Sequence, residues 1–214
     1  RYRLHWRRHR CRRCHHPRKI AIAIPIEIAI GNVIDAVISI ANRLGGVFEN
    51  VVLTQDWHPA KHFSFFSSHA GKAPFDSVEM PYGRQVLWPE HCVQGSKGAA
   101  FPAGLDLPHA SLIVRKGFRR EIDSYSAFFE NDGATPTGLA GYLRQRRLSR
   151  IFLCGLATDF CVHYSALDAL KECFETVVIE DACRAMDLGG SLDTAMSAMR
   201  EAGAVIIRSA ALIE

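Results

Sequence analysis

The chain has 214 residues, of which 48% are hydrophobic and 22% charged, an ordinary composition for a soluble globular protein. This length allows one well-buried domain, and no apolar run reaches the ~18 residues expected of a membrane span. The net charge of +4 comes from one end, because residues 1–19 hold nine of the 26 basic residues and no acid, which leaves 17 basic and 22 acidic residues in 20–214. We therefore expect no membrane protein, and no nucleic-acid-binding surface on the body of the chain.

The seven cysteines are an odd number, and neither their count nor their spacing indicates a disulfide framework. A reducing, cytoplasmic compartment is therefore expected. Residues 1–19 lack apolar periodicity and are predicted to be an atypical basic head outside the natural fold, whereas 20–214 form a single domain. In the head, Cys11 and Cys14 could hold half a zinc site, but no second pair follows at zinc-finger spacing. The arginine run could equally be a nucleic-acid arm, which nothing in the body supports.

Strands and helices alternate along the predicted domain. Isoleucine alternates with other residues from Ile20 to Ile30, as in a strand, and Asn32 to Leu44 has helical spacing before a glycine pair. Further apolar strands are predicted at 50–54, 111–115, 150–154, 176–179 and 204–207, with helices at 137–147, 162–170 and 190–202. This alternation predicts an α/β fold, a three-layer sandwich in which helices cover both faces of a mostly parallel, six-stranded, Rossmann-like sheet.

A long irregular stretch, rich in Gly, Pro, Ser and His, extends from about Trp57 to Leu107. A structureless loop of that length is unusual in a compact domain unless it is functional.

Cys161 lies between a predicted strand and a predicted helix. A thiol there feels the positive end of the helix dipole, which favours thiolate, and free N–H groups of the same turn can hold an oxyanion. The segment therefore predicts a nucleophile with its oxyanion hole. A buried structural cysteine, with Thr158 or Asp159 as a helix cap, is the alternative. His163 is excluded as the base for Cys161, because residues two apart on a helix do not face each other.

Asp56, His58 and His91 are candidate metal ligands. Residues two apart on an extended chain point the same way, and Pro59 favours an extended His58, so Asp56 and His58 can reach one ion. His91 could return from the long stretch as the third ligand. Two histidines and one carboxylate suit Zn²⁺ or Fe²⁺ with positions left open for water. The alternative is that these histidines are solvated and that Asp56 caps a turn.

Lys116 follows a predicted strand and precedes Gly117. Inside a pocket, a lysine there could stabilise a thiolate, although most lysines are solvated. Asp56, Lys116 and Cys161 all come just after strand ends, and ligands bind at the carboxyl ends of parallel strands. We therefore expect these three residues in one shared site.

These segments together resemble the nicotinamidase/pyrazinamidase branch of the isochorismatase-like cysteine hydrolases. The resemblance runs from about Gly31 to the C-terminus and is carried by 54–65, 87–95, 115–117 with 123–129, and 155–162. The first three segments are specific to nicotinamidases, whereas the fourth is shared more widely. The resemblance implies an isochorismatase-like fold and an amidohydrolase acting on linear amides. Such an enzyme converts nicotinamide, and also pyrazinamide, to the acid and ammonia through a cysteine thioester, in NAD salvage.

The same resemblance assigns catalytic roles. Cys161 would be the nucleophile and Lys116 the lysine of the catalytic triad. The Leu156–Ala157 peptide would be cis, and the N–H groups of Ala157 and Cys161 would form the oxyanion hole.

The resemblance also implies one divalent metal ion, expected to be Zn²⁺, with Fe²⁺ or Mn²⁺ as alternatives. Its ligands would be Asp56, His58, His91 and, as in some members, His62. Nicotinamide would be the partner, and a homo-oligomer is allowed. The residues in contact with the substrate would be Trp88, Tyr125, Leu156 and Phe160.

One part of the family pattern is missing from the chain. The triad's third member is an Asp at the end of the first strand, the general base for the thiol and the acid for the leaving ammonia. Counting back from Gly31 by the family's spacing leads to His15–His16, inside the basic head.

Three interpretations of this difference stay open. Residues 1 to about 30 could come from a shifted reading frame or a wrong start. Their sequence could instead be uncertainly assigned or artificial. Finally, the chain could be natural and lack the Asp, with His15, His16 or Glu27 as substitutes.

Two other functions also stay open. One is another carboxamide or ureido hydrolase of the same superfamily, against which the three metal-ligand candidates argue. The other is a non-catalytic ligand-binding or assembly protein, which the missing Asp would explain.

Overall fold

The computed structural model describes residues 18–24 and 31–213. The candidates His15, His16 and Glu27 lie outside the described residues, as does the Cys11–Cys14 pair.

Six parallel strands form the central sheet, in the order β5-β2-β1-β6-β7-β8. Their bounds are β1 (Arg18–Ile24), β2 (Val51–Asp56), β5 (Leu112–Lys116), β6 (Leu148–Leu156), β7 (Glu175–Arg184) and β8 (Val205–Ile207). Strand β1 lies in the middle, where Ala21 has Val51 on one side and Phe152 on the other. The predicted six-stranded sheet is confirmed, and β1 begins at Arg18, inside the segment that was assigned to the head.

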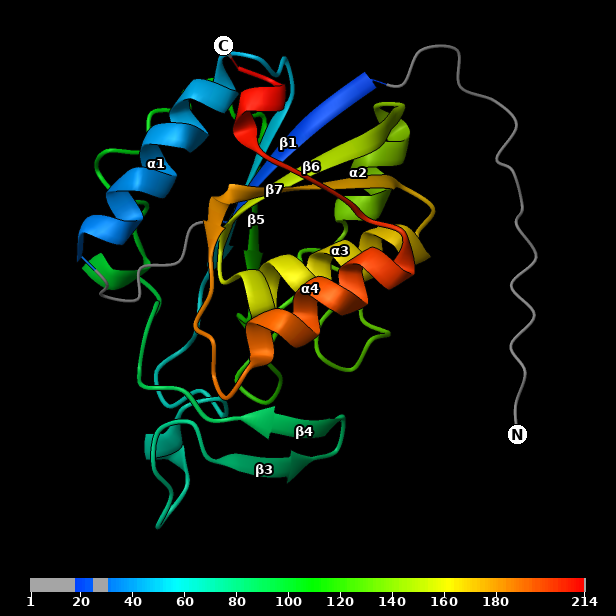
Figure 1. Ribbon diagram of the computed structural model, residues 1–214. Coiled ribbons are helices and arrows are strands. Elements are labelled where there is room, and N and C mark those ends of the chain that lie inside the picture. The colour runs from blue at the N-terminus through cyan, green and yellow to red at the C-terminus, as the bar shows by residue number, and fades with distance from the viewer. Residues whose placement is uncertain (1–17, 25–30, 214) are drawn as a thin grey trace, which may run out of the picture.

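In the described residues, four α-helices complete the three layers. They are α1 (Gly31–Gly45), α2 (Leu139–Gln145), α3 (His163–Lys171) and α4 (Ser191–Ala202). Helix α1 covers one face of the sheet, and α2, α3 and α4 cover the other (Figure 1). Crossovers between parallel strands are right-handed, so the strand order dictates this division: the chain moves one way across the sheet from β1 to β2, through α1, and the opposite way from β5 through β6 and β7 to β8, through α2, α3 and α4.

Helix packing follows the apolar spacing of the sequence. Helix α1 buries Val37, Ala41 and Leu44, which lie on one face at intervals of four and three residues. Helix α2 is shorter than the predicted 137–147. Thr137 precedes the helix and donates its hydroxyl to the Ala127 carbonyl, and Arg147 follows it with a φ of 59°.

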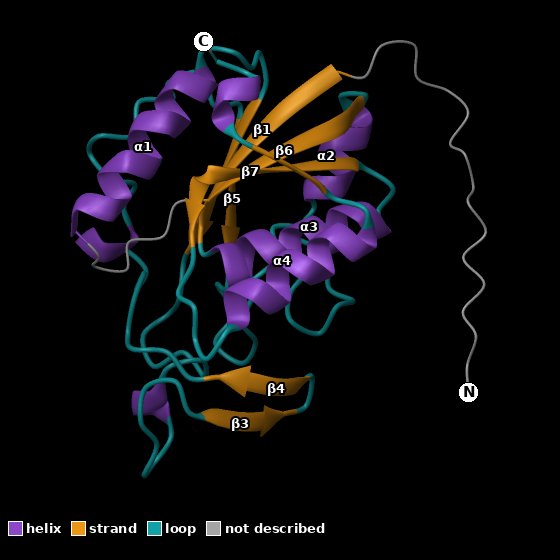
Figure 2. Ribbon diagram, viewed as in Figure 1, coloured by secondary structure: helices purple, strands orange, loops and turns teal. Residues whose placement is uncertain are grey.

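The long stretch between β2 and β5 is folded, contrary to the expectation of an irregular loop. It contains an antiparallel hairpin of β3 (Ser77–Met80) and β4 (Gly83–Val86), and short 3₁₀ helices at Phe66–Ser68 and Lys97–Ala99. The hairpin lies beyond the edge of the sheet toward which the strands point (Figure 2).

This edge of the sheet collects the ends of several strands. Asp56 and Lys116, the last residues of β2 and β5, are paired in register. Strand β6 ends at Leu156, and β7 continues to Arg184, beyond the predicted end at Ile179. Within the described residues, no helix is both long and apolar enough to cross a lipid bilayer.

Candidate active site

Lys116 contacts both of the other strand-end residues that were expected in one site, Asp56 and Cys161. Its side chain is almost fully buried and forms an ion pair with Asp56 Oδ1. The Lys116 ammonium also donates to the Ser124 carbonyl at 2.9 Å and to Cys161 Sγ at 3.3 Å. Asp56, Lys116 and Cys161 thus form one chain of contacts.

Charge and burial oppose each other at this cluster. Burial disfavours the charge of Lys116, but nearby Asp56 and Cys161 outweigh it, so the pKa of Lys116 is raised above its ordinary value. Burial raises the pKa of the Cys161 thiol to about 12, although Lys116 acts to lower it. The resting group is therefore a thiol, and the thiolate expected from the helix dipole needs a proton acceptor to form.

Cys161 lies in a short π-helical turn, Thr158–Val162, which continues into α3. The Leu156–Ala157 peptide before it is cis, as the resemblance implied. The Ala157 carbonyl accepts the N–H groups of Phe160 and Val162, both at 3.1 Å, and so closes the turn over the end of β6. The thiol is thereby held at the carboxyl edge of the sheet.

Asp159 ties this turn to the loop that precedes α4. Its carboxylate accepts the N–H groups of Met186 at 3.0 Å and Asp187 at 2.8 Å, and the hydroxyl of Ser191 at 2.5 Å. No side-chain hydrogen bond caps the turn or α3. The alternative role of Thr158 or Asp159 as a helix cap is therefore wrong, and Asp159 joins two loops instead.

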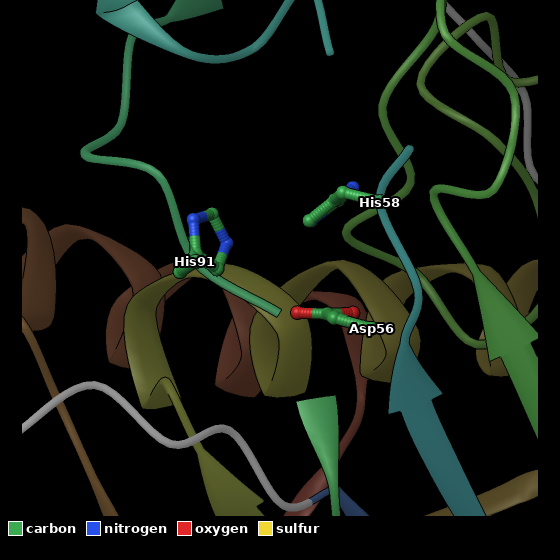
Figure 3. A group of neighbouring side chains, drawn as sticks. All are labelled: Asp56, His58 and His91. Carbon is green, nitrogen blue, oxygen red and sulfur yellow. The ribbon is translucent and has the colours of Figure 1, made fainter. Parts of the chain in front are cut away.

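Asp56, His58 and His91 point toward a common space (Figure 3). One potential ligand atom of each lies within 4.8 Å of the others. His91 reaches this space because its loop runs beside the segment after β2, where the His58 N–H donates to the Cys92 carbonyl at 3.0 Å and His58 is bridged to Val93.

In both histidines Nδ1 faces a backbone carbonyl, which leaves Nε2 as the nitrogen that could bind an ion. His58 Nδ1 lies 2.9 Å from the Gly117 carbonyl, and His91 Nδ1 lies 2.8 Å from the Pro89 carbonyl. A carbonyl can only accept, so each Nδ1 is assigned the proton and each Nε2 keeps its lone pair, the arrangement of metal-bound histidines. Burial lowers the pKa of His58 to about 4, which keeps it neutral. With the Asp56 carboxylate, these donors fit Zn²⁺.

His62 is buried beside this group, but both of its ring nitrogens have partners. Nδ1 accepts the Ser64 N–H at 3.1 Å, and Nε2 lies 2.7 Å from the Arg119 carbonyl. With Nδ1 accepting, Nε2 is the protonated nitrogen. As placed, His62 supports the wall of the site, and one potential ligand atom each of His62, His58 and Asp123 lies within 4.8 Å of the others.

A recess with an empty volume of about 360 Å³, part of it open to solvent, lies over the thiol. Its lining comprises Asp56, His58, Trp88, His91, Asp123, Ser124, Tyr125, Ala157, Phe160, Cys161 and Met186. The rings of Trp88 and Phe160 meet edge to face with centroids 4.8 Å apart, and those of Tyr125 and Phe160 are 5.5 Å apart. Leu156, expected in contact with the substrate, ends β6 and does not line the recess.

Two buried residues of the site, Asp123 and Gln85, were not predicted from the sequence. Asp123 Oδ1 accepts the Ser124 N–H at 2.7 Å, and Gln85 Nε2 lies 3.3 Å from Asp123 Oδ2. Burial opposes the charge of Asp123, but neighbouring positive charge, including the Lys116 ammonium, and the Ser124 N–H outweigh it and lower its pKa. Asp123 belongs to the segment 123–129 that carried the resemblance, which could have singled it out, whereas Gln85 lies in a polar segment without such a signal.

The resemblance puts the triad Asp at the carboxyl end of the first strand, and β1 ends at Ile24, beside Gly155 of β6. His15 and His16, to which the family spacing leads, come before this strand in the sequence and lie outside the described residues. Strand β1 itself contains no acidic residue, and 25–30 lie outside the described residues.

Comparisons with known proteins agree with this geometry. Residues 32–211 match the isochorismatase domain family. A nicotinamidase from Acinetobacter baylyi is 53% identical over 175 residues, which cover 82% of this chain and 82% of the relative.

Two solved structures are similar as well. A nicotinamidase/pyrazinamidase from Acinetobacter baumannii has a TM-score of 0.90 at 47% identity and covers 94% of this chain and 100% of its own. A pyrazinamidase from Pyrococcus horikoshii in complex with zinc has a TM-score of 0.71 at 28% identity and covers 90% of this chain and 99% of its own.

Proposed function

The chain belongs to the isochorismatase domain family, and on this basis we propose that it is a nicotinamidase, which hydrolyses nicotinamide to nicotinate and ammonia and also accepts pyrazinamide. The activity would serve NAD salvage. The observation that carries the proposal is the contact between Lys116 and the Cys161 thiol beneath an aromatic recess that also contains Asp56, His58 and His91.

Cys161 would act as the nucleophile. Its sulfur attacks the carboxamide carbon, the carbon–nitrogen bond breaks, and the thiol proton leaves with ammonia. Water then adds to the thioester carbon, which releases nicotinate and restores the thiol. The N–H groups of Ala157 and Cys161 would hold the oxyanion in both steps.

Lys116 would hold the charge of the thiolate once it forms, since its ammonium already donates to Sγ. The pyridine ring would lie among Trp88, Tyr125 and Phe160, whose rings surround the recess. In the described part of the chain, Asp56 and Asp123 are the carboxylates that line this recess and could exchange protons with the reacting groups.

A divalent ion, Zn²⁺ by our proposal, would be held by Asp56, His58 and His91. When bound, it would supply Lewis acidity to lone-pair donors that enter the recess. Zinc in the Pyrococcus horikoshii pyrazinamidase supports this choice.

Ammonia release from nicotinamide tests the proposal. Cys161→Ala should lower the rate by about 10³-fold or more while the protein stays folded, because no other group can form the thioester. Cys173→Ala, which changes an exposed free cysteine, is the matched control and should keep full activity. Undiminished ammonia release by Cys161→Ala would disprove the nucleophile.

Two alternatives predict different outcomes in the same assay. A carboxamide or ureido hydrolase of another specificity would leave nicotinamide intact and release ammonia from a ureido substrate through Cys161. A binding protein would bind nicotinamide tightly without turnover, as the missing Asp could suggest. Cys161, Cys173 and Cys183 are free thiols, which supports a reducing, cytoplasmic location.

A further inference from the structure

Gln85, on the hairpin beyond the sheet, is fully buried, and its amide binds several parts of the site. Its Nε2 lies 2.7 Å from the Val86 carbonyl, 2.8 Å from the Tyr125 hydroxyl and 3.3 Å from Asp123 Oδ2. The mechanism proposed above gives this buried amide of the hairpin no role.

The neighbours of this amide fix its orientation. The Val86 carbonyl and the Asp123 carboxylate can only accept hydrogen bonds, so the NH₂ group must face them. The opposite end, Oε1, accepts from Asn131 Nδ2 at 3.1 Å and from the Tyr82 hydroxyl at 3.2 Å. Nε2 has two hydrogens, and its two nearer acceptors are the Val86 carbonyl and the Tyr125 hydroxyl, so it acts on Tyr125 as a donor, while Asp123 Oδ2 lies farther away at 3.3 Å.

The hydroxyl oxygen of Tyr125 thus receives two donors. Besides Gln85, the indole Nε1 of Trp88 donates to it at 3.0 Å, and an indole nitrogen cannot accept. Burial, with the negative charge of Asp123, raises the pKa of Tyr125 well above its usual value, so the hydroxyl keeps its proton. Among the described residues, no acceptor receives that proton, and Tyr125 lines the recess.

The backbone of Tyr125 is held by the same network. Its N–H donates to Asn131 Oδ1 at 2.9 Å, and Asn131 Nδ2 donates to Gln85 Oε1. Gln85, Asn131 and Tyr125 therefore close a ring of hydrogen bonds, which leaves the Tyr125 oxygen little freedom to accept from a ligand instead.

We propose that Gln85 is a specificity-determining positioning residue that makes the Tyr125 hydroxyl a hydrogen-bond donor toward a lone pair of the substrate. This inference rests on the proposed nicotinamidase function. The lone pair belongs to the ring nitrogen or to the carboxamide oxygen, and a ligand that presents only C–H or N–H groups at this wall is disfavoured.

The test is a double-mutant cycle on nicotinamide hydrolysis with Gln85→Met and Tyr125→Phe. Each single change should raise KM about 10-fold with kcat within about 2-fold, because a hydrogen bond common to ground and transition states is lost. The double variant should be no worse than either single variant, since both remove the same donor. Tyr82→Phe, which removes another partner of Gln85, is the matched control and should leave KM unchanged.

Gln85→Leu is the second variant if Gln85→Met does not fold. It also removes the amide that donates to Tyr125 and should again raise KM about 10-fold. Binding of benzamide by these variants locates the lone pair. An effect confined to nicotinamide assigns it to the ring nitrogen, and an equal effect on benzamide assigns it to the carboxamide oxygen.

The proposal is overturned if the effects of Gln85→Met and Tyr125→Phe simply multiply, or if Tyr82→Phe raises KM as much as Gln85→Met. Failure of the proposed function is a different result, because the unchanged protein would then release no ammonia from nicotinamide.

Discussion

At the scale of single residues, Lys116 decides how the site is held together. Its ammonium has an ion-pair partner in Asp56 and hydrogen-bond acceptors in Ser124 and Cys161, all away from bulk water. A buried charge that loses its partner is strongly destabilising, so each of these contacts matters to folding as well as to chemistry.

Lys116→Met should impair both stability and thiol reactivity. The Asp56 carboxylate would be left buried without its partner, at a cost of about 3–5 kcal/mol in the free energy of unfolding. Loss of the nearby positive charge should raise the pKa of Cys161 further, so alkylation by iodoacetamide near pH 9 should slow about 10-fold. Denaturant unfolding and alkylation rates measure the two effects, with exposed Lys97→Met as control. An unchanged alkylation rate would contradict an electrostatic effect of Lys116 on the Cys161 thiol.

Single residues were predictable where their neighbours restrict them. Asp56, Lys116 and Cys161 follow apolar strands, so their common edge could be inferred from the alternation of strands and helices alone. The roles of Gln85 and Asp159 could not be predicted, because their hydrogen-bond partners lie far away in sequence and no periodic pattern marks these residues.

At the scale of elements, the turn after β5 determines where His58 sits. Gly117 has a φ of 62°, and a Cβ built on it would lie 2.4 Å from His58 Cε1 and 2.7 Å from Nδ1. The imidazole therefore occupies the space that any other residue's side chain would need, and the Gly117 carbonyl at the same time receives the His58 Nδ1–H.

Gly117→Ala should displace His58 and so lower both bound metal and activity by about 10-fold or more. Gly133→Ala is the matched control, since Gly133 has a similar φ of 65° but nothing within 4 Å of the added Cβ. The control should lose only about 1 kcal/mol of stability and keep its metal. Elemental analysis and ammonia release would check both variants, and equal metal content in the two would refute the steric argument.

The loop before α4 depends on a carboxylate from another element. Asp159→Ala would leave the partly buried N–H groups of Met186 and Asp187 without their acceptor, at about 1 kcal/mol for each lost hydrogen bond. Hydrogen exchange should accelerate at these two amides, and KM should rise because Met186 lines the recess. Exposed Asp193→Ala should do neither. Unchanged hydrogen-exchange protection of residues 186–191 would show that this loop stays ordered without the Asp159 carboxylate.

Prediction of elements failed where the strands are short and polar. The hairpin strands Ser77–Met80 and Gly83–Val86 contain few apolar residues and no continuous apolar run, and the alternation in Ser77–Met80 covers only four residues, too few to mark a strand. Strand β7 extends past Ile179 because its later polar residues have partners, as Asp181 shows by accepting the Ser209 N–H at 2.7 Å.

At the scale of the whole molecule, the metal site should contribute to global stability. Asp56 and His58 lie far from His91 in the sequence and meet it only when the chain is folded, so an ion bound to all three favours the folded state alone. At a free metal concentration 100 times Kd, this stabilisation is about 2.7 kcal/mol.

Removal of the metal by a chelator should therefore lower the Tm by roughly 5–10 °C, as expected for a domain of this size. His91→Ala should have the lower Tm from the start and respond little to the chelator. His109→Ala, which changes an exposed histidine outside the cluster, should behave like the unchanged protein. A Tm that the chelator does not move would argue against a resident ion.

The central place of β1 also has a consequence for synthesis on the ribosome. Ala21 pairs with Val51 soon after both emerge, but its other neighbour, Phe152, is translated about 130 residues later. At 5–20 residues per second, that interval lasts roughly 6–26 seconds. During this time one edge of β1 has no strand beside it, and such edges are sites of aggregation that nascent-chain chaperones cover. The yield of active protein should thus depend on translation speed and chaperone supply more than the stability of the finished fold suggests.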